Sequence, residues 1–245
     1  AIAHFQNEGW TDFMRNQVDT IRSHCAHPIS SNMTCFIGQM DWDRHFTIMD
    51  RTGLSSYADI SYTQNNSSKM DRLRPAKDAP YWLLETAPNW SGGGEIWNIH
   101  NNADGIRFFT WMSILLGGSM VLYWQWRSHW AGQEMQHGTC VDATGRWMPG
   151  RETWQQLSSE FAEHGKWLLE NPAARGPLAI MGSSENAWAL SIDPIHPSNH
   201  YGKRLLNDYY LPLRDAHYHR DIIHPGTPLH DYRLILCPIL PILTD

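Results

Sequence analysis

A single carboxylate stands at the end of an apolar run near the middle of the chain. Residues 83–90 read Leu-Leu-Glu-Thr-Ala-Pro-Asn-Trp, and Tyr81 and Trp82 precede them. Desolvating an isolated acid in such surroundings is costly unless the acid is paired or used. Glu85 therefore has two interpretations. It either pairs with an arginine such as Arg107 or Arg127, or it acts as a reactive carboxylate in a site.

Further polar and aromatic side chains follow the next apolar run along the chain. Trp124 and Arg127 come at its end, and Glu134 and His137 lie in the segment after it. A spacing of three residues places Glu134 and His137 on one face if this segment turns helically, so both could reach one ligand. On residue types alone, core packing explains Trp124 as well as ligand binding does. For Glu134 and His137, a solvated pair in a loop is then the better explanation.

The 13 tryptophans of the 245-residue chain bear on the same question. Their simplest explanation is a bulky core. The alternative is a sugar-binding pocket, because flat aromatic rings pack against the C–H faces of pyranose rings.

The elements that would position these groups alternate along the chain. Apolar runs predict strands over residues 27–33, 57–62, 80–85, 119–126, 178–181, 221–223 and 233–237. Apolar spacing predicts helices over residues 10–22, 41–52, 101–116, 151–169 and 201–214, with a polar loop over 64–69. The continuous apolar run at 119–126 suits a parallel strand buried on both faces. The alternation predicts an α/β fold with parallel sheets.

Composition divides the chain and narrows its class. The stretch Asn171–Pro177 is rich in proline, alanine and glycine, which predicts one domain over 1–172 and a second, cut short, over 173–245. The chain opens on Ala1 and stops on an apolar strand, so we expect it to be a piece of a longer protein. With 42% apolar and 18% charged residues it is globular.

Several partner classes are excluded by the same composition. Net charge is −6 and no basic cluster occurs, which argues against nucleic acid. No apolar stretch approaches the roughly 18 residues of a membrane span. The four cysteines are far apart and form no Cys-x-x-Cys pair, so we expect reduced thiols in a cytoplasmic protein, with no metal and no cofactor.

Five motifs occur in a fixed order along the chain. They are Ser30–Met33, Leu83–Trp90, Tyr123–Arg127, Ala131–Gly138 and Glu185–Leu190. This ordered set resembles the glycoside hydrolase family 42 β-galactosidases over nearly the whole length. The resemblance implies the C-terminal half of a (β/α)8 TIM barrel, strands five to eight, followed by part of a flavodoxin-like α/β domain that assembles a homotrimer in the full-length parent.

The resemblance also implies a reaction and roles for particular residues. The reaction is hydrolysis of terminal non-reducing β-D-galactosides with retention, by two carboxylates about 5–5.5 Å apart. Matched by position, Glu85 is the nucleophile, and Trp90 and Trp124 are aromatic walls of the sugar pocket. Glu134 and His137 match the pair that hydrogen-bonds galactose hydroxyls.

Two departures from the family pattern qualify this match. The segment Ile60–Asn65 differs from the family pattern, so the pocket tyrosine of the family is either Asn65 or replaced by Tyr62. The family's acid/base follows an asparagine upstream of Ala1. The pair Asn7-Glu8 lies too close to Ser30 for that role, and an acid favoured by a helix dipole is the better interpretation.

We therefore expect this piece to be inactive alone, with its acid/base carboxylate outside these residues. Two alternatives stay open. One is another retaining glycosidase of the same barrel class, such as an arabinopyranosidase or a glucanase. The other is a non-catalytic sugar-binding or assembly module.

Overall fold

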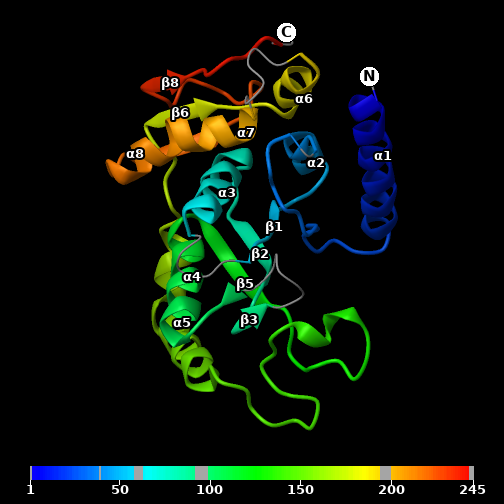
Figure 1. Cartoon of the computed structure of the whole chain (residues 1–245), viewed down its shortest axis with the longest axis vertical. Helices are drawn as coiled ribbons and strands as arrows, with labels where there is room; N and C mark the ends of the chain where they lie inside the picture. Colours follow the sequence, from blue (N-terminus) through cyan, green and yellow to red (C-terminus); the bar gives the residue numbers. More distant parts are fainter. Residues whose placement is uncertain (1, 39, 58–62, 92–98, 194–199, 243–245) are drawn as a thin grey trace. The chain divides into compact units, whose positions relative to one another are not determined.

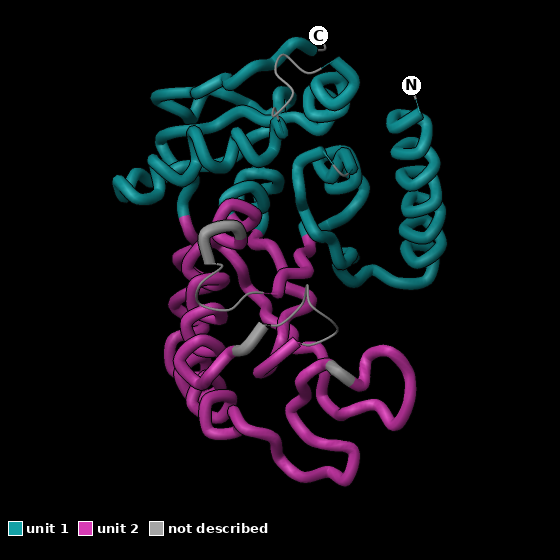
Figure 2. Tube along the Cα trace, in the orientation of Figure 1, with its two compact units in different colours: residues 1–52, 71–79, 174–245 teal, residues 53–70, 80–173 magenta. Residues whose placement is uncertain are grey.

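The computed structural model describes residues 2–38, 40–57, 63–91, 99–193 and 200–242. The chain forms two compact units (Figure 2). Unit 1 comprises residues 1–52, 71–79 and 174–245, and unit 2 comprises residues 53–70 and 80–173. Helix α3 (Thr63–Ala76) contributes residues to both. The sequence-based boundary between 172 and 173 stays a prediction.

Unit 2 is built on a parallel sheet of three strands in the order β1-β2-β5. The strands are β1 (Gly53–Ser55), β2 (Tyr81–Thr86) and β5 (Gly118–Tyr123). Helices α4 (Ala103–Leu115) and α5 (Arg151–Glu170) run side by side along this sheet (Figure 1). Smaller elements complete the unit: β3 (Trp90–Ser91), antiparallel to β4 (Ile99–His100), and the 3-10 helix η2 (Gln133–Gln136).

Local sequence explains how strand β5 follows helix α4. Asn102 caps the helix, since its side chain accepts a hydrogen bond from the N–H of Gly105 at 2.9 Å. The helix ends at Leu115, and Gly117 follows with a φ of +113°, a conformation that favours glycine. In β2, Tyr81 and Leu83 alternate inward and are fully buried, so this strand forms the centre of the sheet.

Unit 1 contains a second parallel sheet, in the order β7-β6-β8. Its strands are β6 (Leu178–Met181), β7 (Arg220–Ile223) and β8 (Leu234–Leu236). Its helical segments are α1 (Ile2–Arg22), α2 (Trp42–Thr47), α6 (Ser184–Ile192), α7 (Tyr201–Arg204), the π-helical η3 (Leu205–Tyr210) and α8 (Leu211–Asp215). The apolar core between sheet and helices contains Leu178, Ile180, Leu190, Tyr201, Leu205, Tyr210 and Ile222.

Most predicted elements are present with shifted ends. Helix α1 begins at Ile2, eight residues before the predicted start at Trp10, and α2 is shorter than predicted. Strand β5 ends at Tyr123, so Trp124 and the two residues after it lie beyond the strand. The predicted strand 57–62 falls largely outside the described residues, and β1 precedes it. None of the described helices is long and apolar enough to cross a membrane.

The strand predicted over residues 27–33 is wrong for the described structure. This segment has no ladder partner there, although Met33 is buried. Ile29 instead pairs with the turn at Asp50. Its N–H donates to the Asp50 carboxylate at 2.7 Å, and its carbonyl accepts from the N–H groups of Asp50 and Arg51 at 3.0 and 3.2 Å. The N–H and the carbonyl of Ile29 are thus both satisfied without a sheet.

The polar loop predicted over residues 64–69 is also wrong, because these residues belong to α3. The helix lacks an apolar stripe that periodicity could detect. Met70 and Leu73 are fully buried, but the helix also buries Asp71, Arg72 and Arg74. Ion pairing rather than apolar spacing stabilises its second half: Arg72 pairs with Asp43, and Arg74 pairs with Asp71 and Asp221.

Candidate active site

Three neighbouring strands of unit 2 bring their carboxyl ends to one edge of the sheet. Ser55 of β1 is in register with Glu85 of β2, and Thr86 is in register with Tyr123 of β5. The ladder continues past the strands, where the N–H of Ser56 donates to the Glu85 carbonyl at 2.9 Å. The N–H of Trp124 donates to the Thr86 carbonyl at 2.8 Å. This edge is where parallel α/β folds place reactive side chains.

Glu85 accepts a short hydrogen bond from a tyrosine at this edge. The hydroxyl of Tyr57 donates to Glu85 Oε1 at 2.6 Å, and both residues are half-buried. Burial raises the pKa of Tyr57 well above its usual range, and the hydrogen bond and charge of Glu85 and the charge of Glu134 raise it further. Tyr57 therefore keeps its proton and donates a hydrogen bond to Glu85.

The two arginines considered as ion-pair partners of Glu85 have partners elsewhere. Arg107 pairs with Glu160, with Nε lying 2.9 Å from Oε1. Arg127 donates from Nη2 to the carbonyl of Ala143 at 2.6 Å, and its guanidinium lies 5.9 Å from the ring centroid of Trp130. The structure thus gives each arginine a role that does not involve the site.

His137 lies beside Tyr57 in the same unit. The two ring centroids are 5.8 Å apart, with the ring planes inclined at 44°. Its Nδ1 lies 3.0 Å from the hydroxyl of Ser91, in strand β3. A contact chain therefore runs from Ser91 through His137 and Tyr57 to Glu85.

Glu134 occupies the helical turn that the Glu-x-x-His spacing requires. It lies in η2, and the N–H of His137 donates to the Glu134 carbonyl at 3.1 Å. Its carboxylate is 3.6 Å from Nε2 of His129, and both side chains are about half exposed. The charge of Glu134 also contributes to raising the pKa of Tyr57.

The two predicted aromatic walls lie on segments that flank Glu85. Trp124 follows β5, its side chain is 38% exposed, and its ring centroid is 6.5 Å from that of His129. Trp90 is half-buried in β3, where its carbonyl accepts from the N–H of Gly138 at 2.8 Å. Tyr62 lies outside the described residues.

Tyr57 was missed by the sequence reasoning. The signal that could have found it is its place directly after a strand in the sheet that ends at Glu85. The strand was predicted to start at residue 57, whereas β1 ends at Ser55. Tyr57 was therefore assigned to the beginning of a strand, although it lies just past the carboxyl end of one.

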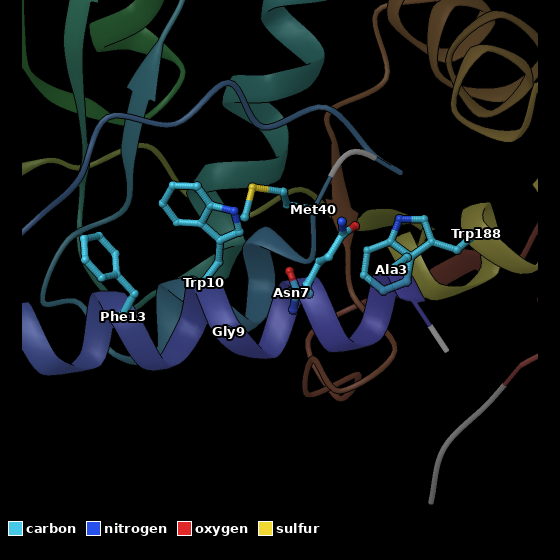
Figure 3. Close-up of a pocket in the computed structure, with 8 residues that line it drawn as sticks. Ala3, Asn7, Gly9, Trp10, Phe13, Met40 and Trp188 are labelled. Atoms are coloured by element: carbon cyan, nitrogen blue, oxygen red, sulfur yellow. The ribbon is translucent and has the colours of Figure 1, made fainter.

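Unit 1 contains a cavity and a group of possible metal ligands. A cavity of about 600 Å³ lies against α1 and is lined by Trp10, Phe13, Met40 and Trp188 among others (Figure 3). No carboxylate lines it among the described residues. Nearby in sequence, Glu8 is inside α1 and pairs with Arg44 at 2.7 Å, which explains this acid structurally.

Asp41, Asp43 and His224 also approach one another, with one ligand atom of each within 4.8 Å of the others. Each is already engaged. Asp41 caps α2, Asp43 pairs with Arg72, and Nδ1 of His224 accepts from the N–H of Gly226 at 3.1 Å. An Nδ1 that accepts leaves the proton on Nε2 of the neutral ring, which does not suit metal binding.

Two family models together match nearly the full chain. The family model described as β-galactosidase, glycoside hydrolase family 42, matches residues 2–164. The chain belongs to glycoside hydrolase family 42. A second model, described as the β-galactosidase trimerisation domain, matches residues 177–245.

The curated relatives that the chain matches are longer than the chain itself. A β-galactosidase of Bacillus licheniformis is 28% identical over 237 residues, covering 96% of this chain and 35% of the relative. The chain thus spans about a third of the length of the curated relatives it matches.

Solved structures confirm the fold. The β-galactosidase of Bacillus circulans has a TM-score of 0.89 at 19% identity, covering 96% of this chain and 35% of the other. That of the haloarchaeon Halorubrum lacusprofundi has a TM-score of 0.86 at 21% identity, covering 98% and 38%. The predicted fold class, α/β with part of a TIM barrel, is confirmed by these neighbours and by the parallel strands.

Proposed function

We propose that this chain is part of a retaining β-galactosidase in which Glu85 is the nucleophile. Glu85 would attack the anomeric carbon of a terminal β-D-galactoside and form a galactosyl-enzyme as the glycosidic bond breaks. A second carboxylate would protonate the departing oxygen and then take a proton from the water that releases galactose. The observation that carries this proposal is the position of Glu85 at the strand edge, with the Tyr57 hydroxyl 2.6 Å from its Oε1.

Tyr57 suits the role of a neutral donor to the nucleophile. Its hydroxyl donates to one carboxylate oxygen, Oε1, and so orients the carboxylate. The high pKa of Tyr57 keeps this donor protonated. Galactose hydroxyls would be hydrogen-bonded by Glu134 and His137, and the sugar ring would pack against Trp90 and Trp124, with Tyr62 as a further candidate contact.

The second carboxylate is proposed to lie outside these 245 residues. Two observations support this: the chain spans about a third of its relatives, and Glu8, the acid of the Asn-Glu pair, is held in an ion pair with Arg44. Without leaving-group protonation, which typically contributes 10²–10⁴-fold, the chain alone would hydrolyse galactosides very slowly.

Assembly as a homotrimer is proposed for the full-length enzyme. The match of residues 177–245 to the trimerisation domain supports it. A cytoplasmic location is proposed from the four cysteines, which are free in the structure. Sedimentation of the full-length enzyme and fractionation of its host would test these two points.

A mechanism-based label tests the nucleophile directly. A 2-deoxy-2-fluoro-β-galactoside with a good leaving group should form a stable adduct with the full-length enzyme, and peptide mass spectrometry should locate it on Glu85. An adduct on a different residue would overturn the assignment. A panel of nitrophenyl glycosides then separates a galactosidase from an arabinopyranosidase or a glucanase, and absence of all hydrolysis would favour a binding or assembly module.

A further inference from the structure

The imidazole of His137 is in contact on two sides. The buried hydroxyl of Ser91 lies 3.0 Å from Nδ1, and the ring of Tyr57 lies 5.8 Å away between centroids. Ser91 is only 2% exposed. Because Nδ1 faces this hydroxyl, Nε2 is the ring nitrogen left to meet a ligand.

The backbone fixes Ser91 against His137 independently of their side chains. The two residues form an antiparallel bridge, and the N–H of Gly138 donates to the Trp90 carbonyl at 2.8 Å. The side chain of Asn89 donates from Nδ2 to the Thr139 carbonyl at 3.0 Å. These bonds join residues 89–91 to residues 137–139.

Gly138 is essential for this close approach. A Cβ at this position would lie 1.8 Å from Asn89 Oδ1 and 2.4 Å from the Trp90 carbonyl oxygen, far inside contact distance. The glycine therefore allows the two segments to meet, and their meeting carries the hydroxyl of Ser91 to Nδ1.

The direction of the hydrogen bond follows from the hydroxyl's own proton. Among the described residues, the hydrogen-bond partner of the Ser91 hydroxyl is Nδ1 of His137. If the Ser91 oxygen accepted a hydrogen bond from an Nδ1–H group, the hydroxyl hydrogen of Ser91 would need another acceptor. The site is nearly closed to water, so leaving that hydrogen without an acceptor would cost appreciable free energy. A hydroxyl that donates to Nδ1 satisfies both groups with one bond and leaves the imidazole proton on Nε2.

We propose that Ser91 is a positioning residue that holds His137 in the Nε2–H tautomer, so that His137 donates a hydrogen bond to a sugar hydroxyl oxygen. This inference rests on the proposed function for the identity of the ligand. The tautomer itself follows from the contacts of Ser91 and does not depend on the reaction.

Nitrogen NMR of the 245-residue chain with ¹⁵N-labelled histidine tests the tautomer. The His137 signals, assigned by their loss in His137→Gln, should report a protonated Nε2 and an unprotonated Nδ1. Ser91→Ala should mix the two tautomers, and Ser91→Thr, which keeps the hydroxyl, should restore the original one. Ser128→Ala is the matched control, because its hydroxyl bonds Thr139 at 2.9 Å on the same loop without contacting His137. A protonated Nδ1 in the unmodified chain, or an unchanged pattern in Ser91→Ala, would overturn the inference.

Kinetics of the full-length enzyme separate this inference from the proposed function. Ser91→Ala should raise KM for a nitrophenyl galactoside roughly threefold to tenfold, the range of one hydrogen bond, with a smaller change in kcat. Ser91→Thr should recover most of it, and Ser128→Ala should have no effect. Hydrolysis with unaltered KM in Ser91→Ala would count against the positioning role alone. If the tautomer is confirmed but the enzyme does not hydrolyse galactosides, the proposed function is wrong, and the effect of Ser91 on the tautomer of His137 is still supported.

Discussion

Two carboxylates, one in each unit, lie in parallel strands and differ in burial and in the groups that contact them. Asp221 in β7 is fully buried and is surrounded by donors. Arg74 donates from Nε to Oδ1 at 3.0 Å, and the N–H of Gly176 and the hydroxyl of Tyr232 donate to Oδ2 at 3.0 and 3.1 Å. Glu85 in β2 is half-buried and accepts from the neutral Tyr57.

The network of unit 1 extends to a second buried acid. Asp71 pairs with Nη1 of Arg74 at 2.7 Å and with Arg220 at 3.0 Å, and accepts from the hydroxyl of Tyr210 at 2.7 Å. Two acids and two arginines thus balance within one buried cluster, which is how a protein can hold charge in its interior. A charge compensated in this way is suited to holding structure together. A carboxylate oriented by a hydroxyl at the carboxyl end of a strand is instead placed to act on a ligand.

Replacing each acid by its amide should separate the two roles, and the largest effect is expected at Glu85. Glu85→Gln in the full-length enzyme removes the attacking oxygen anion and should lower kcat by about 10⁴-fold or more. Its unfolding midpoint should stay near that of the unmodified enzyme, since the amide oxygen of glutamine can still accept the hydrogen bond from Tyr57. Hydrolysis close to the original rate would show that Glu85 is not the nucleophile.

The reverse result is expected for Asp221→Asn. Removing one acid from the buried cluster leaves Arg74 partly uncompensated, which should cost roughly 3–5 kcal/mol of unfolding free energy. Urea unfolding of the 245-residue chain measures this loss. Asp12→Asn is a matched control, because Asp12 forms an exposed pair with Arg15 and its loss should be close to neutral. Equal urea unfolding midpoints for Asp221→Asn and Asp12→Asn would contradict the structural role of Asp221.

The fold was predictable where apolar periodicity carries the information. Buried strands such as β2 and β6 consist of adjacent apolar residues, and the strand–helix alternation then implies parallel sheets. Helix α3 was not predictable in this way, because Asp71, Arg72 and Arg74 are buried by pairing with residues far along the chain. A local pattern cannot reveal a partner 147 positions away.

The motifs predict five site residues, whose roles stay predictions, and they did not point to Tyr57. Glu85, Trp90, Trp124, Glu134 and His137 lie in ordered motifs that the family resemblance aligns. Tyr57 acts through a contact between neighbouring strands, and its role depends on β1 ending at Ser55. A shift of two residues in a strand end decides whether a side chain stays in the sheet or reaches its carboxyl edge, and such ends are poorly defined by sequence.

Each of the two carboxylates accepts a hydrogen bond from a tyrosine, Tyr57 at Glu85 and Tyr232 at Asp221. Removing each hydroxyl compares the two sites with a smaller change. Tyr57→Phe in the full-length enzyme removes the donor to Glu85 and keeps the ring beside His137. A hydrogen bond to a charged group is worth about 1.5–3 kcal/mol, so kcat/KM should fall roughly tenfold to hundredfold. Steady-state kinetics on a nitrophenyl galactoside checks this. An unchanged kcat/KM would mean that the 2.6 Å contact does not influence catalysis.

Tyr232→Phe is the matched change at the structural carboxylate and should have the smallest effect. It removes one donor from Asp221, and Arg74 and the N–H of Gly176 continue to satisfy that acid. The expected loss of unfolding free energy is about 1 kcal/mol, from the midpoint of urea unfolding at constant slope. Activity of the full-length enzyme should not change, because the hydroxyl of Tyr232 contacts Asp221, a buried acid of unit 1 that has no role in the proposed reaction. If Tyr232→Phe lowered kcat/KM as much as Tyr57→Phe, the division between a structural and a reactive carboxylate would fail.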